Sequence, residues 1–118
     1  NIACWGDNQN LKLFVGDTTG HHGLKKNYGF GAISVTAKTL DTILRKFKVK
    51  KVDFVKIDVE GSELEVFEGM EETLIRFKPN IIVEVSSNEH LILSYVKKYG
   101  YNAMLIPDSS PPYCLLTC

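Results

Sequence analysis

The stretch at residues 52–65 constrains the fold of this chain more than any other. It reads VDFVKIDVEGSELE: an apolar strand ends at two acids, Asp58 and Glu60, the chain turns through Gly61, and a helix-forming segment follows. Because the strand is apolar on both faces, we expect a buried parallel strand covered by helices. Open α/β sheets bind ligands beyond the carboxyl ends of their strands. The two acids therefore mark the expected ligand-binding end of the sheet.

Two strands and a short helix are expected before this stretch. Residues 11–15 and 33–35 have strand patterns, and the second strand is expected to pair back on the first across a glycine-rich loop. Thr39 is the expected cap of the helix. Its buried face recurs at intervals of three and four and comprises Leu40, Ile43, Leu44 and Phe47.

One long helix is expected directly after the stretch. Ser62 with Glu65 three residues later forms a capping-box pattern, and Pro79 ends the helix. A single apolar face comprises Leu64, Phe67, Met70, Leu74 and Phe77.

The C-terminal third continues the alternation of strands and helices. Residues 81–85 predict a second buried strand, and Ser87 or Asn88 is expected to cap a helix closed by Gly100. The inward residues of that helix are expected to be Leu91, Ile92, Tyr95 and Val96. Strands at 103–106 and 113–116, on either side of a proline-rich turn, predict an antiparallel hairpin.

Composition and charge exclude several classes of function. The chain has 118 residues and a formal net charge of zero, so no overall field attracts nucleic acid or an anionic membrane surface. No apolar run approaches the roughly 20 residues that a transmembrane helix needs. We therefore expect neither a nucleic-acid partner nor a membrane partner.

The three cysteines carry no recognisable motif. Cys114 and Cys118 lie four apart in an expected strand, so about 13 Å separates them, which is too far for a disulfide. An odd count without zinc-type spacing favours reduced thiols and a cytoplasmic location. All three, including Cys4, are expected to be small buried hydrophobic residues.

The same central stretch resembles a known family. The sequence KIDVEG at residues 56–61, the acids and glycine that follow at Glu63, Glu65 and Gly69, and Pro79 with the strand at 81–85 resemble the signature of the FkbM-type methyltransferases. The segment at residues 39–41 and the one at residues 1–7 match that family as well. The resemblance implies a Rossmann-like fold with a C-terminal antiparallel hairpin, and an S-adenosylmethionine-dependent O-methyltransferase acting on a hydroxyl of a sugar or other small metabolite.

One part of the family pattern is absent. The glycine-rich turn after the first strand does not occur, and the chain begins at Asn1 without a methionine. We expect residues 1–118 to be a single partial domain, truncated at its N-terminus.

The resemblance also indicates site residues. Asp58 would lie near the sulfonium of S-adenosylmethionine and near the acceptor, where a carboxylate steers the cation or acts as a base. Glu60 is the second catalytic candidate, and Ile2 and Ala3 are expected beside the adenine. A structural alternative is that Glu60 pairs with Lys56, or that either acid caps the following helix.

Further candidates bind the acceptor. Glu84 ends the neighbouring strand at the same edge of the sheet, and His21 and His22 lie in the glycine-rich loop. Three acids at one edge would suit Mg²⁺ or Ca²⁺, but the resemblance implies no metal, and we expect none.

A different class of function stays open at this point. The chain is alternatively a non-catalytic interaction module, either a pseudoenzyme or a fragment that completes its sheet with a partner. If the first strand of the parent fold is missing, the strand at residues 52–59 has a bare edge, and we expect self-association through it.

Overall fold

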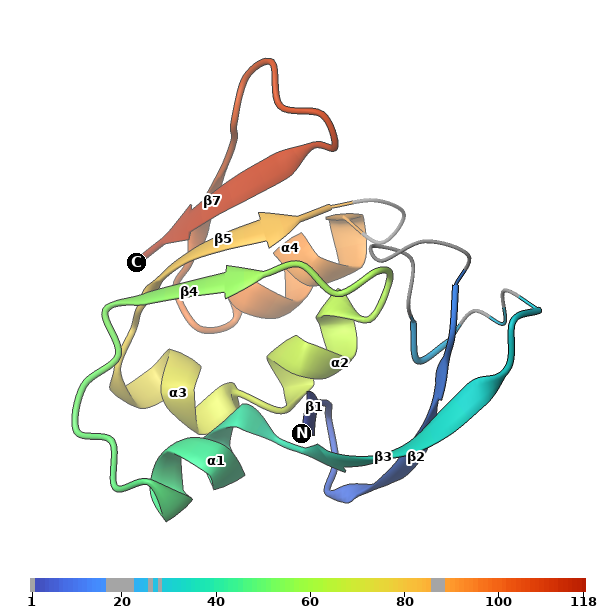
Figure 1. Cartoon of the computed structure of the whole chain (residues 1–118). Coiled ribbons are helices and arrows are strands. Elements are labelled where there is room, and N and C mark those ends of the chain that lie inside the picture. Colours follow the sequence, from blue (N-terminus) through green and yellow to red (C-terminus); the bar gives the residue numbers. More distant parts are fainter. Residues whose placement is uncertain (1, 17–22, 26, 28, 86–88) are drawn as a thin grey trace.

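The computed structural model describes residues 2–16, 23–25, 27, 29–85 and 89–118. Its N-terminal part forms a small three-stranded sheet of β1 (Ala3–Cys4), β2 (Gln9–Phe14) and β3 (Ala32–Lys38). The strand order is β1-β3-β2, with β1 parallel and β2 antiparallel to β3 (Figure 1). The predicted pairing of the two N-terminal strands is confirmed, and β3 continues further than expected, to Lys38.

A second sheet has four strands. They are β4 (Phe54–Ile57), β5 (Asn80–Glu84), β6 (Asn102–Leu105) and β7 (Tyr113–Thr117), in the order β4-β5-β7-β6. The first two strands are parallel, whereas β7 is antiparallel to both β5 and β6. This arrangement confirms the two-strand unit around the acidic stretch and the C-terminal hairpin.

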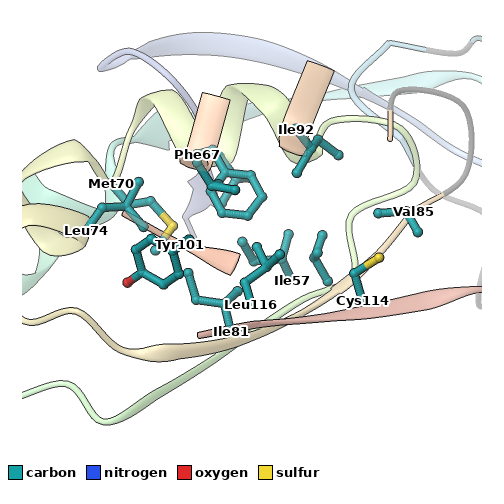
Figure 2. Packing of buried hydrophobic residues seen from close by; sticks show 13 residues of the cluster. Ile57, Phe67, Met70, Leu74, Ile81, Val85, Ile92, Tyr101, Cys114 and Leu116 are labelled. Carbon is teal, nitrogen blue, oxygen red and sulfur yellow. The ribbon is translucent and has the colours of Figure 1, made fainter. Parts of the chain in front are cut away.

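The hydrophobic core lies on one face of the four-stranded sheet. The helices are α1 (Leu40–Lys46), α2 (Glu63–Glu68), α3 (Glu71–Arg76) and α4 (Glu89–Lys97). Figure 2 shows Phe67 of α2, Leu74 of α3 and Ile92 of α4 packed towards Ile57 and Ile81 of the strands. All five side chains are almost fully buried. Among the described residues, no helix has the length and apolar character needed to cross a bilayer.

The expectation that the acidic-stretch strand is buried on both faces is wrong. Val55 and Ile57 face the core, but Lys56 is exposed and Phe54 is 53% exposed. Met104 on β6 is 60% exposed. Because side chains alternate along a strand, these exposed residues define an open second face of the sheet. Within the described chain, β4 pairs only with β5 and is an edge strand.

The long helix expected after the stretch is broken into α2 and α3. At the break, a Cβ on Gly69 would overlap the carbonyl oxygen of Trp5, so only glycine allows this approach of the β1 segment. α3 then begins, and its N-terminus is capped by Asp41, a residue distant in sequence. The Asp41 carboxylate accepts hydrogen bonds from the backbone amides of Glu72 at 2.8 Å and Thr73 at 2.9 Å. The interruption is therefore caused by tertiary contacts.

The capping predictions have mixed outcomes. Thr39 is confirmed, because its hydroxyl accepts a hydrogen bond from the amide of Thr42 at 3.1 Å. The capping box at Ser62 is wrong, since its side chain makes no cap hydrogen bond. Instead, Glu63 folds back and accepts a hydrogen bond from the amide of Gly61 at 2.9 Å.

Some side chains expected inside the protein are exposed. Phe47, which ends α1, and Leu91, in the first turn of α4, face solvent, as does Cys118 at the end of the chain. All three cysteines are free thiols, as predicted. The proposed caps Ser87 and Asn88 lie outside the described residues.

Candidate functional site

A cavity lies beyond the carboxyl end of β4, where the sequence places the ligand-binding edge. Its volume is about 290 Å³. Its walls come from the three-stranded sheet, from the loop before β3 and from the turn after β4, and comprise Ala3, Cys4, Leu13, Gly23, Leu24, Asp58, Val59, Glu60 and Ser62. Both predicted catalytic residues, Asp58 and Glu60, thus share one cavity with Ala3, which was predicted to bind the cofactor.

The turn after β4 positions the two acids. β4 ends at Ile57, Asp58 follows directly, and the chain reverses through Glu60 at φ 38° and Gly61 at φ 82°. A positive φ is sparsely populated by residues other than glycine. Such conformations concentrate at functional sites, where the surrounding structure holds them.

Asp58 is held in its ionised form. Lys56 donates to Asp58 Oδ2 over 2.8 Å, so the lysine pairs with Asp58 and not, as the structural alternative had it, with Glu60. This bond lowers the pKa of Asp58 and raises that of Lys56. Partial burial opposes the lowering, but the hydrogen bond outweighs it.

Glu84 lies beside Asp58 but outside the cavity. The hydroxyl of Tyr113 is 3.4 Å from Asp58 Oδ2 and 3.5 Å from Glu84 Oε2. Burial is the largest cause that raises the pKa of Glu84, followed by its hydrogen bond and charge interaction with Asp58. The two acids therefore have pKa values displaced in opposite directions.

Buried polar groups line the start of α2. Ser62 is 2% exposed, and its hydroxyl has no hydrogen-bond partner among the described residues. Such a group is costly unless a ligand or water meets it. Nearby, Lys25 forms an ion pair of 2.5 Å with Glu65, which ties the segment of Gly23 and Leu24 to α2 across the cavity.

The remaining predicted residues fall in different places. Ile2 lines a neighbouring cavity of about 520 Å³ that shares Ala3 and Leu13 with the first one. The histidines His21 and His22 lie outside the described residues. Among the residues that are described, no group of three or more His, Cys, Asp or Glu side chains is arranged to hold a metal ion.

Sequence reasoning missed Tyr113 and gave Lys56 and Ser62 only structural roles. Tyr113 lies 55 residues from Asp58 along the chain, and only the strand order brings them together. A signal existed for Lys56, since residues two apart on a strand share a face.

An open α/β sheet with acids bordering a cavity at its carboxyl edge is the arrangement of a ligand-binding α/β domain. The family model for the methyltransferase FkbM domain matches residues 1–103 of the 118. The chain therefore belongs to the FkbM methyltransferase domain family. Searches of the curated proteins and of the solved structures each found no match.

Proposed function

We propose that this protein is an S-adenosylmethionine-dependent O-methyltransferase that acts on a hydroxyl of a small metabolite or sugar. The observation that carries the proposal is the cavity at the end of β4, which joins Ala3 to Asp58 and Glu60 in a member of a methyltransferase family.

The residues around the cavity fit this cofactor. S-adenosylmethionine, when bound, supplies a methyl group on a positively charged sulfur. Asp58 offers a carboxylate that stays ionised, and the unpartnered hydroxyl of Ser62 offers a hydrogen bond. Ala3 and the adjoining apolar cavity lined by Ile2 suit the flat face of the adenine.

The acids at this edge of the sheet also explain why the acceptor would be a hydroxyl compound. Asp58, Glu60 and Glu84 are hydrogen-bond acceptors when ionised, and hydroxyl groups are donors. Within the described part of the chain, Lys56 is the one ammonium that forms an ion pair with these carboxylates, and this excess of negative charge favours a neutral, hydroxyl-bearing acceptor over an anionic one. An oriented carboxylate then receives the proton of the hydroxyl as the oxygen is methylated.

We also propose that residues 1–118 form one domain of the Rossmann-like type. Two observations support it: β4 and β5 are parallel strands joined through α2 and α3, and the sheet ends in an antiparallel hairpin. β7 lies beyond the matched residues, yet it pairs between β5 and β6 and belongs to the same sheet.

Calorimetric titration with S-adenosylmethionine tests the proposal on the natural polypeptide that carries this sequence. We expect the wild-type protein to bind, and Asp58→Asn to weaken binding about tenfold, equivalent to about 1.4 kcal/mol. Asp53→Asn is the matched control, because Asp53 lies before β4 in an exposed ion pair with Lys51. Absence of binding by the wild type, or equal effects of both substitutions, would contradict the assignment of the cavity.

A further inference from the structure

Four polar side chains from three strands meet on the open face of the four-stranded sheet. Glu84 and Tyr113 are direct cross-strand partners, and the parallel register of β4 and β5 brings Asp58 alongside Glu84. Lys56 lies two residues before Asp58 and therefore shares its face. The result is a continuous polar row at the carboxyl edge of the sheet, next to the cavity.

The contacts within this row are unequal. Lys56 Nζ lies 2.8 Å from Asp58 Oδ2 and 6.0 Å from the centre of the Tyr113 ring. No ion pair to Glu84 occurs among the described residues. The Tyr113 hydroxyl is within reach of both carboxylates, but it has one proton and donates to one of them at a time.

Electrostatics separates the two acids. Two neighbouring carboxylates do not ionise equally easily, and the ammonium of Lys56 favours the charge on Asp58. Glu84 faces the charges of Asp58, Glu60 and Glu63 besides being partly buried, and all of these raise its pKa. Partial burial and the two neighbouring acids also raise the pKa of Tyr113, so its hydroxyl remains a donor.

We propose that Glu84 is the general base of methyl transfer, that Asp58 is a permanent anion facing the sulfonium, and that Lys56 and Tyr113 are positioning residues that keep these roles apart. This inference rests on the proposed function. In the methyl-transfer step, the acceptor oxygen forms a bond to the methyl carbon as the methyl–sulfur bond breaks, and the electron pair of that bond stays on sulfur. The hydroxyl proton goes to the carboxylate of Glu84.

General principles of acid–base catalysis favour this division. A catalytic base works best when its pKa lies close to the working pH, and environments that push two acids apart assign their roles. A carboxylate tied to a lysine is a weak base but a dependable negative charge. The acid without an ammonium partner among the described residues is the better proton acceptor.

Carboxyl ¹³C NMR titration tests the separation without any activity assay. In the natural polypeptide, we expect Glu84 to titrate above the ordinary range of glutamate and Asp58 below that of aspartate. Lys56→Met should bring the titration midpoints of Glu84 and Asp58 closer together, and Tyr113→Phe should alter both midpoints. If Glu84 titrates in its ordinary range, or if Lys56→Met leaves both midpoints unchanged, the inference is overturned.

Binding and turnover then test the roles. Asp58→Asn should weaken the binding of S-adenosylmethionine more than that of S-adenosylhomocysteine, which lacks the sulfonium charge. Glu84→Gln should leave the affinity for both compounds unchanged. With a methyl-tritiated donor and a mixture of monosaccharides, Glu84→Gln should lower kcat about 10²-fold or more. Unchanged kcat in Glu84→Gln overturns the base assignment. A wild-type protein that binds neither compound contradicts the proposed function instead, so the two failures are distinguishable.

Discussion

At the scale of single residues, the site depends on which acid carries charge. The sequence placed Asp58 and Glu60 correctly at the end of β4, because a strand, two acids and a glycine form a local pattern. The spacing of two placed Lys56, Asp58 and Glu60 on one side of an extended chain, so it allowed Lys56 to pair with either acid; the chain turns at Glu60, and Lys56 pairs with Asp58. The sequence did not indicate that Tyr113 belongs to the site, because only the strand order brings it next to Glu84.

The first prediction concerns the two acids in the cavity. Asp58→Asn keeps the shape of the side chain but removes the charge that faces the sulfonium, and at subsaturating S-adenosylmethionine it should lower methyl transfer about tenfold, in line with the expected loss of affinity. Glu60→Gln should lower it less, because Glu60 lines the cavity and forms the turn, whereas Asp58 also carries the ion pair with Lys56. Turnover and melting temperature should be measured together. Near-normal turnover of Asp58→Asn with an unchanged melting temperature would refute the catalytic role of this residue.

A second prediction concerns the pH dependence of stability. The folded-state pKa of Glu84 is raised, so its stabilising contribution is complete below its unfolded pKa and is lost as pH rises through the folded pKa. Glu84→Gln should therefore gain stability relative to wild type as pH increases above about 4.3, the ordinary value for glutamate. Thermal melts from pH 3 to 8 measure this, with exposed Glu68→Gln as the control. A difference between Glu84→Gln and wild type that does not change with pH would contradict it.

At the scale of elements, local patterns predicted where helices and strands lie better than where they stop. The positions of β5, α4 and the C-terminal hairpin follow from apolar periodicity and turn residues. The break between α2 and α3 could not be predicted, because Trp5 and Asp41 cause it from 64 and about 30 residues away along the chain. The exposure of one face of β4 could not be predicted for a similar reason, because an apolar strand pattern does not show whether other elements cover both faces of the sheet.

Gly69 provides a test at this scale. Gly69→Ala places a methyl group against the backbone of Trp5, and overpacking of this kind costs about 1–3 kcal/mol. Gly6→Ala is a matched control from the same junction, because its Cβ would meet nothing closer than 3.4 Å. Denaturant melts should show a lower midpoint for Gly69→Ala alone. Equal midpoints for the two variants would mean that the chain around Trp5 moves aside freely.

At the scale of the whole molecule, the four-stranded sheet leaves both an edge and a face open. β4 has no strand on its second side within the described chain, and Phe54 and Met104 are exposed on the open face. Exposed strand edges are templates for pairing with another chain, and apolar patches favour association.

We therefore predict that the 118-residue chain self-associates through β4. Light scattering should show an average mass that rises with concentration, and Phe54→Lys should reduce the rise, because lysine on an edge strand opposes pairing. Phe30→Lys is the control, since Phe30 is 62% exposed but lies outside both sheets. A stable monomer at all concentrations would contradict the prediction.

The cavity joins the three-stranded sheet to the turn that follows β4 of the other sheet, and this has a consequence for cooperativity. Ala3 and Leu13 belong to the three-stranded sheet, whereas Asp58 follows the edge strand of the other. Each sheet has its own hydrogen bonds, and we expect the two sheets to open as separate units when no ligand is bound. A ligand seated between them, at 100 times its Kd, adds about 2.7 kcal/mol to the state in which they are docked. Amide exchange at Trp5, which bonds to Lys38, should then slow together with that of β5, so that two separate unfolding events merge into one.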